Sequence, residues 1–139
     1  MKVENWNSRE RAIEWKTTKN GRPHFVPVCD RAAEILDAIQ PNEFGFLFPS
    51  SVEPGEPMVE QHMRYLISRS GVKHFAPRDL RRTWKTLAGE AGLSKDDRDR
   101  LQNHARSDIS SIHYDRYEYI EEKRAAVSKW ETWVNTHVL

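Results

Sequence analysis

The sequence predicts a mostly helical α+β domain, in which an N-terminal β-hairpin or small antiparallel sheet precedes a helical bundle. Residues 11–28 alternate in hydrophobicity around an Asn-Gly pair, whereas residues 30–136 carry apolar side chains at helical spacing between capping residues and glycines. The 139 residues show no internal repeat and are enough for one domain. We therefore expect residues 1–139 to form one unit, with the hairpin at 11–28 and the helical part at 30–136.

Residues 11–18 and 23–28 are the two expected strands of the hairpin. The Asn-Gly pair at residues 20–21 separates them, and such a pair tolerates the positive φ values of a tight primed turn. Pro23 and Pro27 have no N–H to donate to a sheet. The second strand is therefore expected to lie at an edge or to be paired on one side only.

Four helices are expected next. Asp30 is suited to cap the first, and Gly71 to stop the second. Pro77 suits the first turn of the third, and Ser94 can cap a short fourth helix that reaches about Asn103. The side chains expected to face inward on the first three helices are Ala32, Ala33, Ile35, Leu36, Ile39, Met63, Leu66, Ile67, Leu80, Thr83, Trp84, Leu87 and Ala88.

The last part of the chain predicts a helix or turn around residues 109–117 and a longer helix from about residue 120 to 134. The long helix is charged but carries an apolar seam, which requires a surface to pack against. The residues of this seam are Ala125, Ala126, Val127, Trp130, Trp133 and Val134. We interpret its tryptophans, and Trp84, as core or interface residues rather than as platforms for stacking DNA bases.

Charge and cysteine content exclude several classes of function. With 22 basic and 21 acidic residues the net charge is +1, so any nucleic-acid site must come from local clustering. Cys29 is the single cysteine, which rules out an internal disulfide and a thiolate zinc cluster and fits a reducing cytoplasm. No apolar run approaches the ~20 residues that span a bilayer. The sequence predicts a cytoplasmic protein with no metal, no cofactor and no membrane partner.

Three arginines crowd the start of the third expected helix. Arg78, Arg81 and Arg82 are spaced i, i+3 and i+4, which places them close to one face within a single turn. A solvated basic face is the ordinary explanation. However, the positive end of the helix dipole disfavours gathered cations unless an anion lies opposite. Because a guanidinium grips two phosphate oxygens at once, the cluster predicts a phosphate site.

Four motifs, in order, resemble those of the catalytic domain of tyrosine recombinases, the phage integrase family. "TKNGRPHFVPV" is similar to its β-hairpin, "PRDLRRTWKTLAGEAGL" to its second arginine motif, "LQNHA" to its histidine motif and "SSIHYDRYEY" to its nucleophile segment. Each motif alone is weak, but together they extend from about Trp15 to Trp133. The resemblance implies a partial catalytic domain that acts on double-stranded DNA without a cofactor. It also implies self-association through the C-terminal helix within a recombination complex.

The resemblance implies a role for each matched residue. Tyr114 would attack a DNA phosphodiester and form a 3′-phosphotyrosyl bond, releasing a 5′-hydroxyl. Arg81 and His104 would bind the scissile phosphate, and Lys19 would protonate the leaving 5′ oxygen from the minor groove. Arg78 completes the expected catalytic set. The further side chains expected to contact DNA are Arg22, Arg82 and Arg106.

Each of these residues also has an ordinary explanation. Lys19 fits a soluble turn, His104 fits a favourable cation at a helix C-terminus, and Tyr114 fits a half-buried tyrosine. Tyr117 and Tyr119 are alternative nucleophiles. Only the spacing of ten residues from His104 favours Tyr114.

The chain departs from the family pattern at three points. Arg78 replaces the usual histidine and does not exchange protons near neutral pH, so acid and base work would fall on Lys19 or His104. Asn103 replaces a glycine, which is tolerable because asparagine accepts left-handed backbone geometry. No residue matches the family's first catalytic arginine, because the two arginines before the hairpin lie too close to it. We therefore expect a C-terminal fragment that is inactive alone.

Two other functions fit the same sequence. The first is a non-catalytic DNA-binding remnant, in which Lys19 and the arginines contact phosphates and nothing is cleaved. The second is a helical protein-interaction module whose apolar C-terminal helix docks on a neighbour. Trp130 and Trp133 could serve this docking and the self-association of a recombinase alike.

Overall fold

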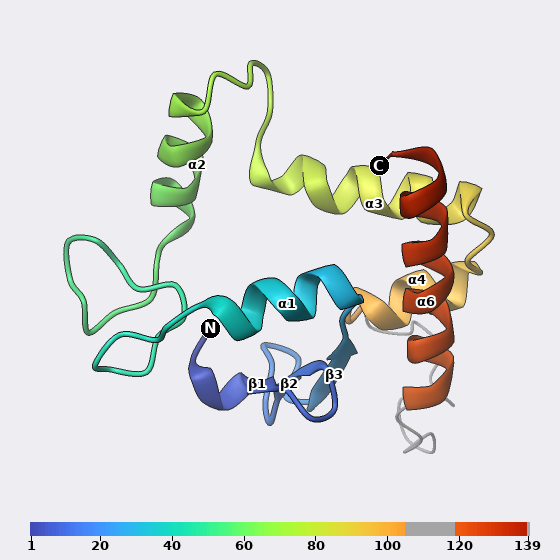
Figure 1. The fold of residues 1–139 in the computed structure, drawn as a ribbon, viewed down its shortest axis with the longest axis horizontal. Helices are drawn as coiled ribbons and strands as arrows, with labels where there is room; N and C mark the ends of the chain where they lie inside the picture. The colour runs from blue at the N-terminus through green and yellow to red at the C-terminus, as the bar shows by residue number, and fades with distance from the viewer. Residues whose placement is uncertain (105–118, 139) are drawn as a thin grey trace.

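The computed structural model describes residues 1–104 and 119–138 of the chain (Figure 1). A 3-10 turn, η1 (Val3–Asn5), precedes strands β1 (Trp6–Asn7), β2 (Ala12–Trp15) and β3 (His24–Pro27). The helices are α1 (Asp30–Ala38), α2 (Glu60–Arg69), α3 (Pro77–Glu90), α4 (Lys95–Leu101) and α6 (Ile120–His137). The predicted mostly helical α+β class is confirmed. The helix or turn expected at residues 109–117 lies outside the described residues.

The three strands form one antiparallel sheet in the order β1-β2-β3. Ile13 pairs with Val26 in β3, which confirms the hairpin, and with Trp6 in β1 on its other side. The edge position predicted for the strand that contains Pro27 is also confirmed. The strands are shorter than predicted, because pairing stops several residues before the turn on each side.

The turn of the hairpin differs from the predicted two-residue primed turn. Gly21 N–H donates to Thr18 O at 2.8 Å, and Thr18 N–H donates to Arg22 O at 3.0 Å. Gly21 has a φ of 70°, whereas Asn20 keeps a negative φ. This is the pattern of a three-residue loop, in which an ordinary turn is followed by a left-handed glycine. The primed turn is wrong because it requires a positive φ at both central residues.

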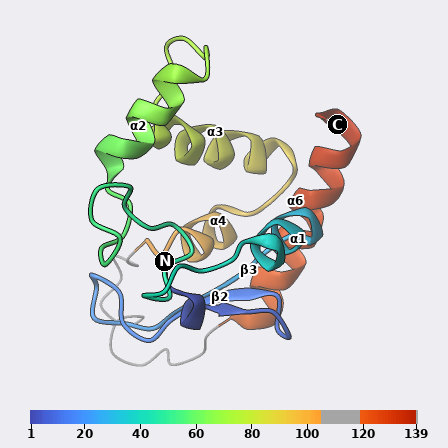
Figure 2. The same cartoon turned by 60° about the vertical axis from the view of Figure 1, so that its left-hand side comes forward.

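Helix α1 begins differently from the prediction. Asp30 is its first helical residue rather than its cap, and its N–H donates to the Glu131 carboxylate of α6 at 2.8 Å. The Asp30 carboxylate itself pairs with Arg11 at 2.9 Å. Ala33 is buried in this helix, but Ile35, predicted to face inward, is 52% exposed. In both views of the ribbon α1 lies between the sheet and α3 (Figures 1 and 2).

Helix α2 stands at one side of the molecule, where it contacts α3 (Figure 1). Gly71 follows it with a φ of 81°, which fits the predicted stop. The predicted inward stripe is wrong, because α2 has no buried residue, and Met63 and Leu66 are exposed. The apolar spacing predicted the helix itself, but the other described elements do not bury its apolar side chains.

The main core lies where α3, α4 and α6 meet (Figure 2). Its buried residues are Ala88, Ala91, Leu93, Leu101 and Ala126. Helix α4 begins as predicted, with the Ser94 hydroxyl accepting from Asp97 N–H at 3.1 Å. The first half of α3 does not reach this core, so Leu80 and Thr83 are exposed against prediction. Among the described residues no helix is both long and apolar enough to cross a bilayer.

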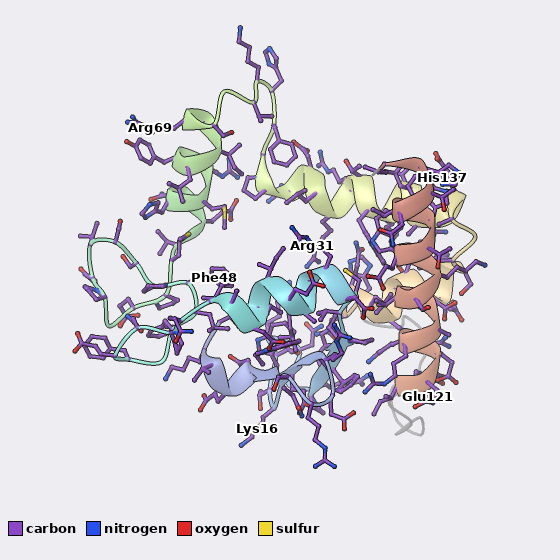
Figure 3. The ribbon with its side chains drawn as sticks, viewed as in Figure 1. Lys16, Arg31, Phe48, Arg69, Glu121 and His137 are labelled. Carbon is purple, nitrogen blue, oxygen red and sulfur yellow. The ribbon has the colours of Figure 1, made fainter. Side chains whose placement is uncertain are left out.

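The tryptophans of α3 and α6 pack against this core, as predicted. The Trp84 ring meets the edge of Trp130 with centroids 6.3 Å apart, and Trp130 stacks on Trp133 at 5.4 Å. The Trp133 ring stacks in turn on His137 at 4.8 Å, near the end of α6 (Figure 3). Within the predicted seam Ala125 is the exception, because it is exposed.

Candidate functional site

The predicted arginine cluster lies on the exposed first half of α3. Arg78, Arg81 and Arg82 are all solvent-exposed. Arg82 lies 3.8 Å from Asp79, a long ion pair between exposed groups that contributes little to stability. The guanidinium of Arg81 has no hydrogen-bond or ion-pair partner among residues 1–104 and 119–138. Its donors are therefore available for an anion from solution.

Two hydrogen bonds hold α4 against the segment of α3 that carries these arginines. Gln102 Nε2 donates to the backbone oxygen of Arg81 at 3.2 Å. Arg98 Nη1 donates to the backbone oxygen of Lys85, one turn later, at 2.7 Å. Since Gln102 is two residues before His104, these contacts bring the turn after α4 close to Arg81.

His104 is attached to α4 at two points. Its backbone N–H donates to Asp99 O at 2.9 Å, and its ring Nδ1 lies 3.1 Å from the Asp99 carboxylate. The same carboxylate accepts hydrogen bonds from Lys85 and Lys95, both at 2.8 Å. Hydrogen bonds from Lys85 and Lys95 hold the pKa of the Asp99 carboxyl well below its usual range. Asp99 is therefore ionised at neutral pH.

The hairpin loop that carries Lys19 is tied to the turn that carries His104. Asn20 Nδ2 donates to Asn103 O at 3.2 Å, and Asn103 Nδ2 donates to Thr18 Oγ1 at 3.1 Å. These bonds flank Lys19 on both sides and cross more than 80 residues of sequence. Asn103 has a φ of 54°, so the prediction that asparagine would replace glycine in left-handed geometry is confirmed.

A further contact holds β3 against α4. His24 Nε2 lies 3.3 Å from Leu101 O. Burial lowers the pKa of His24, and the nearby Lys123 ammonium lowers it further. A neutral ring with its hydrogen on Nε2 donates to the Leu101 carbonyl. The sheet and α4 therefore present the Lys19 loop and the His104 turn as one connected surface.

Replacing Asn103 separates its two contributions. Asn103→Gly removes the hydrogen bond to Thr18 but keeps an unstrained positive φ, whereas Asn103→Ala removes the bond and strains the backbone. We expect the alanine variant to be less stable than the glycine variant by about 1 kcal/mol. Urea unfolding of the two variants measures this difference. Equal midpoints would contradict it.

The structure connects the segments that carry three of the five predicted catalytic residues. Lys19, Arg81 and His104 come from three elements that hydrogen bonds connect directly. Arg78 lies a turn earlier on α3, near the Glu60 carboxylate of α2. The pKa of the Glu60 carboxyl is lowered, mainly by the hydrogen bond from Arg64 and to a smaller extent by the charge of Arg78. Tyr114, the predicted nucleophile, lies outside the described residues, as does the DNA-binding candidate Arg106.

Sequence reasoning missed the polar residues that hold the site together. Asp99, Gln102 and Asn20 make the connecting hydrogen bonds, although Asn20 was predicted only to form the hairpin turn and the other two had no predicted role. Arg22 and Arg82, the other predicted DNA contacts, lie on the hairpin loop and on α3 and are exposed. The one sequence signal that could have found Asp99 is its position five residues before His104, which allows a local contact between the two side chains.

Two other features lie away from this site. A hollow of about 300 Å³ between α2 and the start of α3 is lined mainly by apolar side chains and Glu60, a lining unsuited to phosphate. The described residues contain no group of three or more histidine, cysteine, aspartate or glutamate side chains able to hold a metal ion. The surface formed by the Lys19 loop, Arg81 and His104 is the candidate functional site.

Comparison with known proteins finds a relative among prophage integrases. No protein-family model matches the chain, and no solved structure matches it significantly. The chain is 30% identical over 126 residues to prophage integrase IntA of Escherichia coli (strain K12). The match covers 86% of the chain but 30% of that relative, so the chain spans less than a third of its length. This similarity supports a relationship between the chain and the integrases of prophages.

Proposed function

We propose that this chain is part of the catalytic domain of a tyrosine-type site-specific DNA recombinase that acts on double-stranded DNA in the cytoplasm. The observation that carries the proposal is the network that joins the Lys19 loop, the Arg81 helix and the His104 turn. These hydrogen bonds connect three separate segments, each of which carries a side chain with a catalytic role in the proposal. The similarity to a prophage integrase supplies the independent support.

The proposed reaction is an exchange of phosphodiester bonds. The Tyr114 phenol attacks the scissile phosphorus, so a bond from its oxygen to phosphorus forms while the bond to the 5′ oxygen breaks. The Lys19 ammonium gives its proton to that 5′ oxygen, which avoids release of a strongly basic alkoxide. Arg81 and His104 contact the non-bridging oxygens, where negative charge increases in the transition state. Attack by a second 5′-hydroxyl on the phosphotyrosine then rejoins DNA without an external energy source.

Arg78 has a narrower role in this proposal. A guanidinium donates hydrogen bonds to phosphate but does not lose its proton in proteins. Arg78 would therefore contact the DNA backbone near the cleavage point and take no part in proton transfer. With the histidine of the family pattern replaced, the proton from Tyr114 must pass to His104 or to solvent.

No residue of this chain matches the first catalytic arginine of the family, and this lowers the rate of DNA cleavage that we expect from the 139 residues alone. Removal of one preorganised donor to the reacting oxygens typically costs about 3 kcal/mol of transition-state stabilisation. We therefore propose that the 139 residues alone bind DNA but cleave an ordinary phosphodiester too slowly to detect. A non-catalytic DNA-binding remnant is the second candidate, and it is favoured by the same exposed cations.

The interaction-module hypothesis has less support. Trp130 and Trp133, which were to anchor a partner, pack against the core of their own chain. We still propose that the residues of α6 other than these tryptophans mediate self-association in the assembled recombination complex. The exposed face of α6 is charged rather than apolar in the first turns, where Glu121 projects into solvent (Figure 3).

DNA binding tests the part of the proposal that the recombinase and the remnant share. We expect Arg81→Ala to weaken binding to duplex DNA and to reduce the slope of log K against log salt by about one unit, because one phosphate contact is lost. Fluorescence anisotropy of a labelled duplex at several salt concentrations measures both quantities.

Arg69→Ala is the matched control for this measurement. Arg69 is also an exposed arginine and projects from the far end of α2 (Figure 3). It contacts Tyr65 within its own helix, at 2.9 Å. The control should keep the wild-type slope. An equal loss of slope in both variants would show that binding follows total charge rather than the proposed site.

A further inference from the structure

We propose that Asp99 is a positioning residue that fixes the hydrogen of His104 on Nδ1 and so directs Nε2 to the reacting phosphate. The inference rests on the proposed role of His104 in DNA cleavage. His104 Nδ1 lies 3.1 Å from the Asp99 carboxylate, within hydrogen-bond distance. The backbone N–H of His104 also donates to Asp99 O at 2.9 Å, so the ring and its main chain are anchored to one residue.

The carboxylate can only accept in this contact. Asp99 is ionised, and an ionised carboxylate has no hydrogen to donate. The hydrogen between the two groups must therefore belong to Nδ1 of the histidine. This assignment leaves Nε2, on the opposite edge of the ring, as the nitrogen available to a substrate.

Asp99 is itself held in place from two helices. Lys85 reaches it from α3 at 2.8 Å, and Lys95 reaches it from the first turn of α4, also at 2.8 Å. The Asp99 side chain is 21% exposed, so these contacts are partly shielded from water. Lys85 lies one turn after Arg81 on α3. The contacts from Lys85 to Asp99 and from Asp99 to His104 therefore hold the imidazole at a fixed position relative to α3, the helix that carries Arg81.

The arrangement suits both tasks that phosphoryl transfer asks of a histidine. In the neutral ring Nε2 is an acceptor and can take the proton that Tyr114 loses. In the protonated ring Nε2–H is a donor to a phosphate oxygen, and the nearby carboxylate stabilises the positive charge. With the hydrogen of the neutral ring on Nε2 instead, the ring could not accept a proton at the nitrogen that faces the DNA.

Imidazole ¹⁵N spectroscopy of the 139-residue chain tests the pairing without DNA. In its neutral form, the ring of wild-type His104 should show Nδ1 protonated and Nε2 unprotonated. Asp99→Asn should shift the population several-fold towards the Nε2-protonated form, because the neutral amide can donate to Nδ1. Asp96→Asn is the matched control, since it removes an equal charge from the same helix, one turn earlier, and should leave the spectrum of His104 unchanged.

Two results would overturn the inference. One is a wild-type His104 that carries its hydrogen on Nε2, and the other is an Asp99→Asn variant that leaves the tautomer unaltered. The wild-type spectrum decides the first point even if the variant fails to fold.

Covalent attachment to DNA tests the consequence for catalysis, using the activated substrate described in the Discussion. Asp99→Asn should slow attachment by about 10- to 100-fold, the effect expected when the outer hydrogen-bond partner of a functional histidine is lost. It should also change the pH profile of the rate, whereas Asp96→Asn should change neither. A normal rate and profile in Asp99→Asn would overturn the positioning role alone. No attachment by the wild type would instead overturn the proposed function, and with it any positioning for catalysis.

Discussion

Tyr114→Phe is expected to abolish covalent attachment of the chain to DNA, with a loss of about 1,000-fold or more in rate. The phenol oxygen is the atom that bonds to phosphorus, and phenylalanine has none. The substrate should carry sulfur in place of the 5′ bridging oxygen at the cleavage point. A thiolate is a far weaker base than an alkoxide, so its departure compensates for the unmatched arginine and for slow proton transfer. Denaturing gel electrophoresis of labelled DNA detects the adduct.

Tyr117→Phe and Tyr119→Phe are the controls for this experiment. The Tyr119 ring lies under the Arg100 guanidinium, 4.0 Å from its centre, so it is engaged with α4 rather than with the arginines of α3. Both controls should form the adduct normally. An adduct that survives Tyr114→Phe would move the nucleophile to another tyrosine. If the wild type forms none, the chain is better described as a DNA-binding remnant.

Trp130→Ala is expected to have the largest effect on stability, about 3 kcal/mol of unfolding free energy. The indole of Trp130 lies between Trp84 of α3 and Trp133 of α6, and it packs against the buried residues of the core. Its removal leaves a cavity where α3 meets α6. Urea unfolding followed by circular dichroism measures the loss, which is a large fraction of the stability of an ordinary domain.

Trp130→Phe separates volume from the aromatic contacts. It keeps a ring between Trp84 and Trp133, so its loss should be well below that of the alanine variant. A double-mutant cycle with Trp84→Ala should show a coupling of about 1 kcal/mol for the edge-to-face pair. A Trp130→Ala variant with the wild-type midpoint would show that α6 is not held to α3 through this residue.

The fold class and the helix positions could be predicted because they depend on local patterns. The hairpin followed from alternation around Asn20 and Gly21, and the start of α4 followed from Ser94. The two-residue strand β1 was missed, because a strand so short has no period to detect. The exposure of Ile35 and Leu80 was also missed. Apolar spacing identifies a helix face, but it does not show whether another element covers that face.

The candidate site was predicted from motif residues and is held together by hydrogen bonds that the motifs did not predict. Arg81, His104 and Lys19 were recognised because their residue types and their order along the chain match the motifs of the tyrosine recombinases. Asp99 and Asn103 act by reaching other segments, and Asn103 spans 85 residues to Thr18. Such pairings depend on how the chain folds back on itself, so local sequence does not specify them.

The hydrogen bond from the Asp30 amide to Glu131 has a consequence for the order in which the molecule is built. The first amide of α1 receives its acceptor from α6, 101 residues later in the sequence. While a ribosome is still producing the segment between them, the beginning of α1 must rely on water for that acceptor. The first turn of α1 therefore gains this acceptor only after translation has passed Glu131, so α1 and α6 complete this contact together.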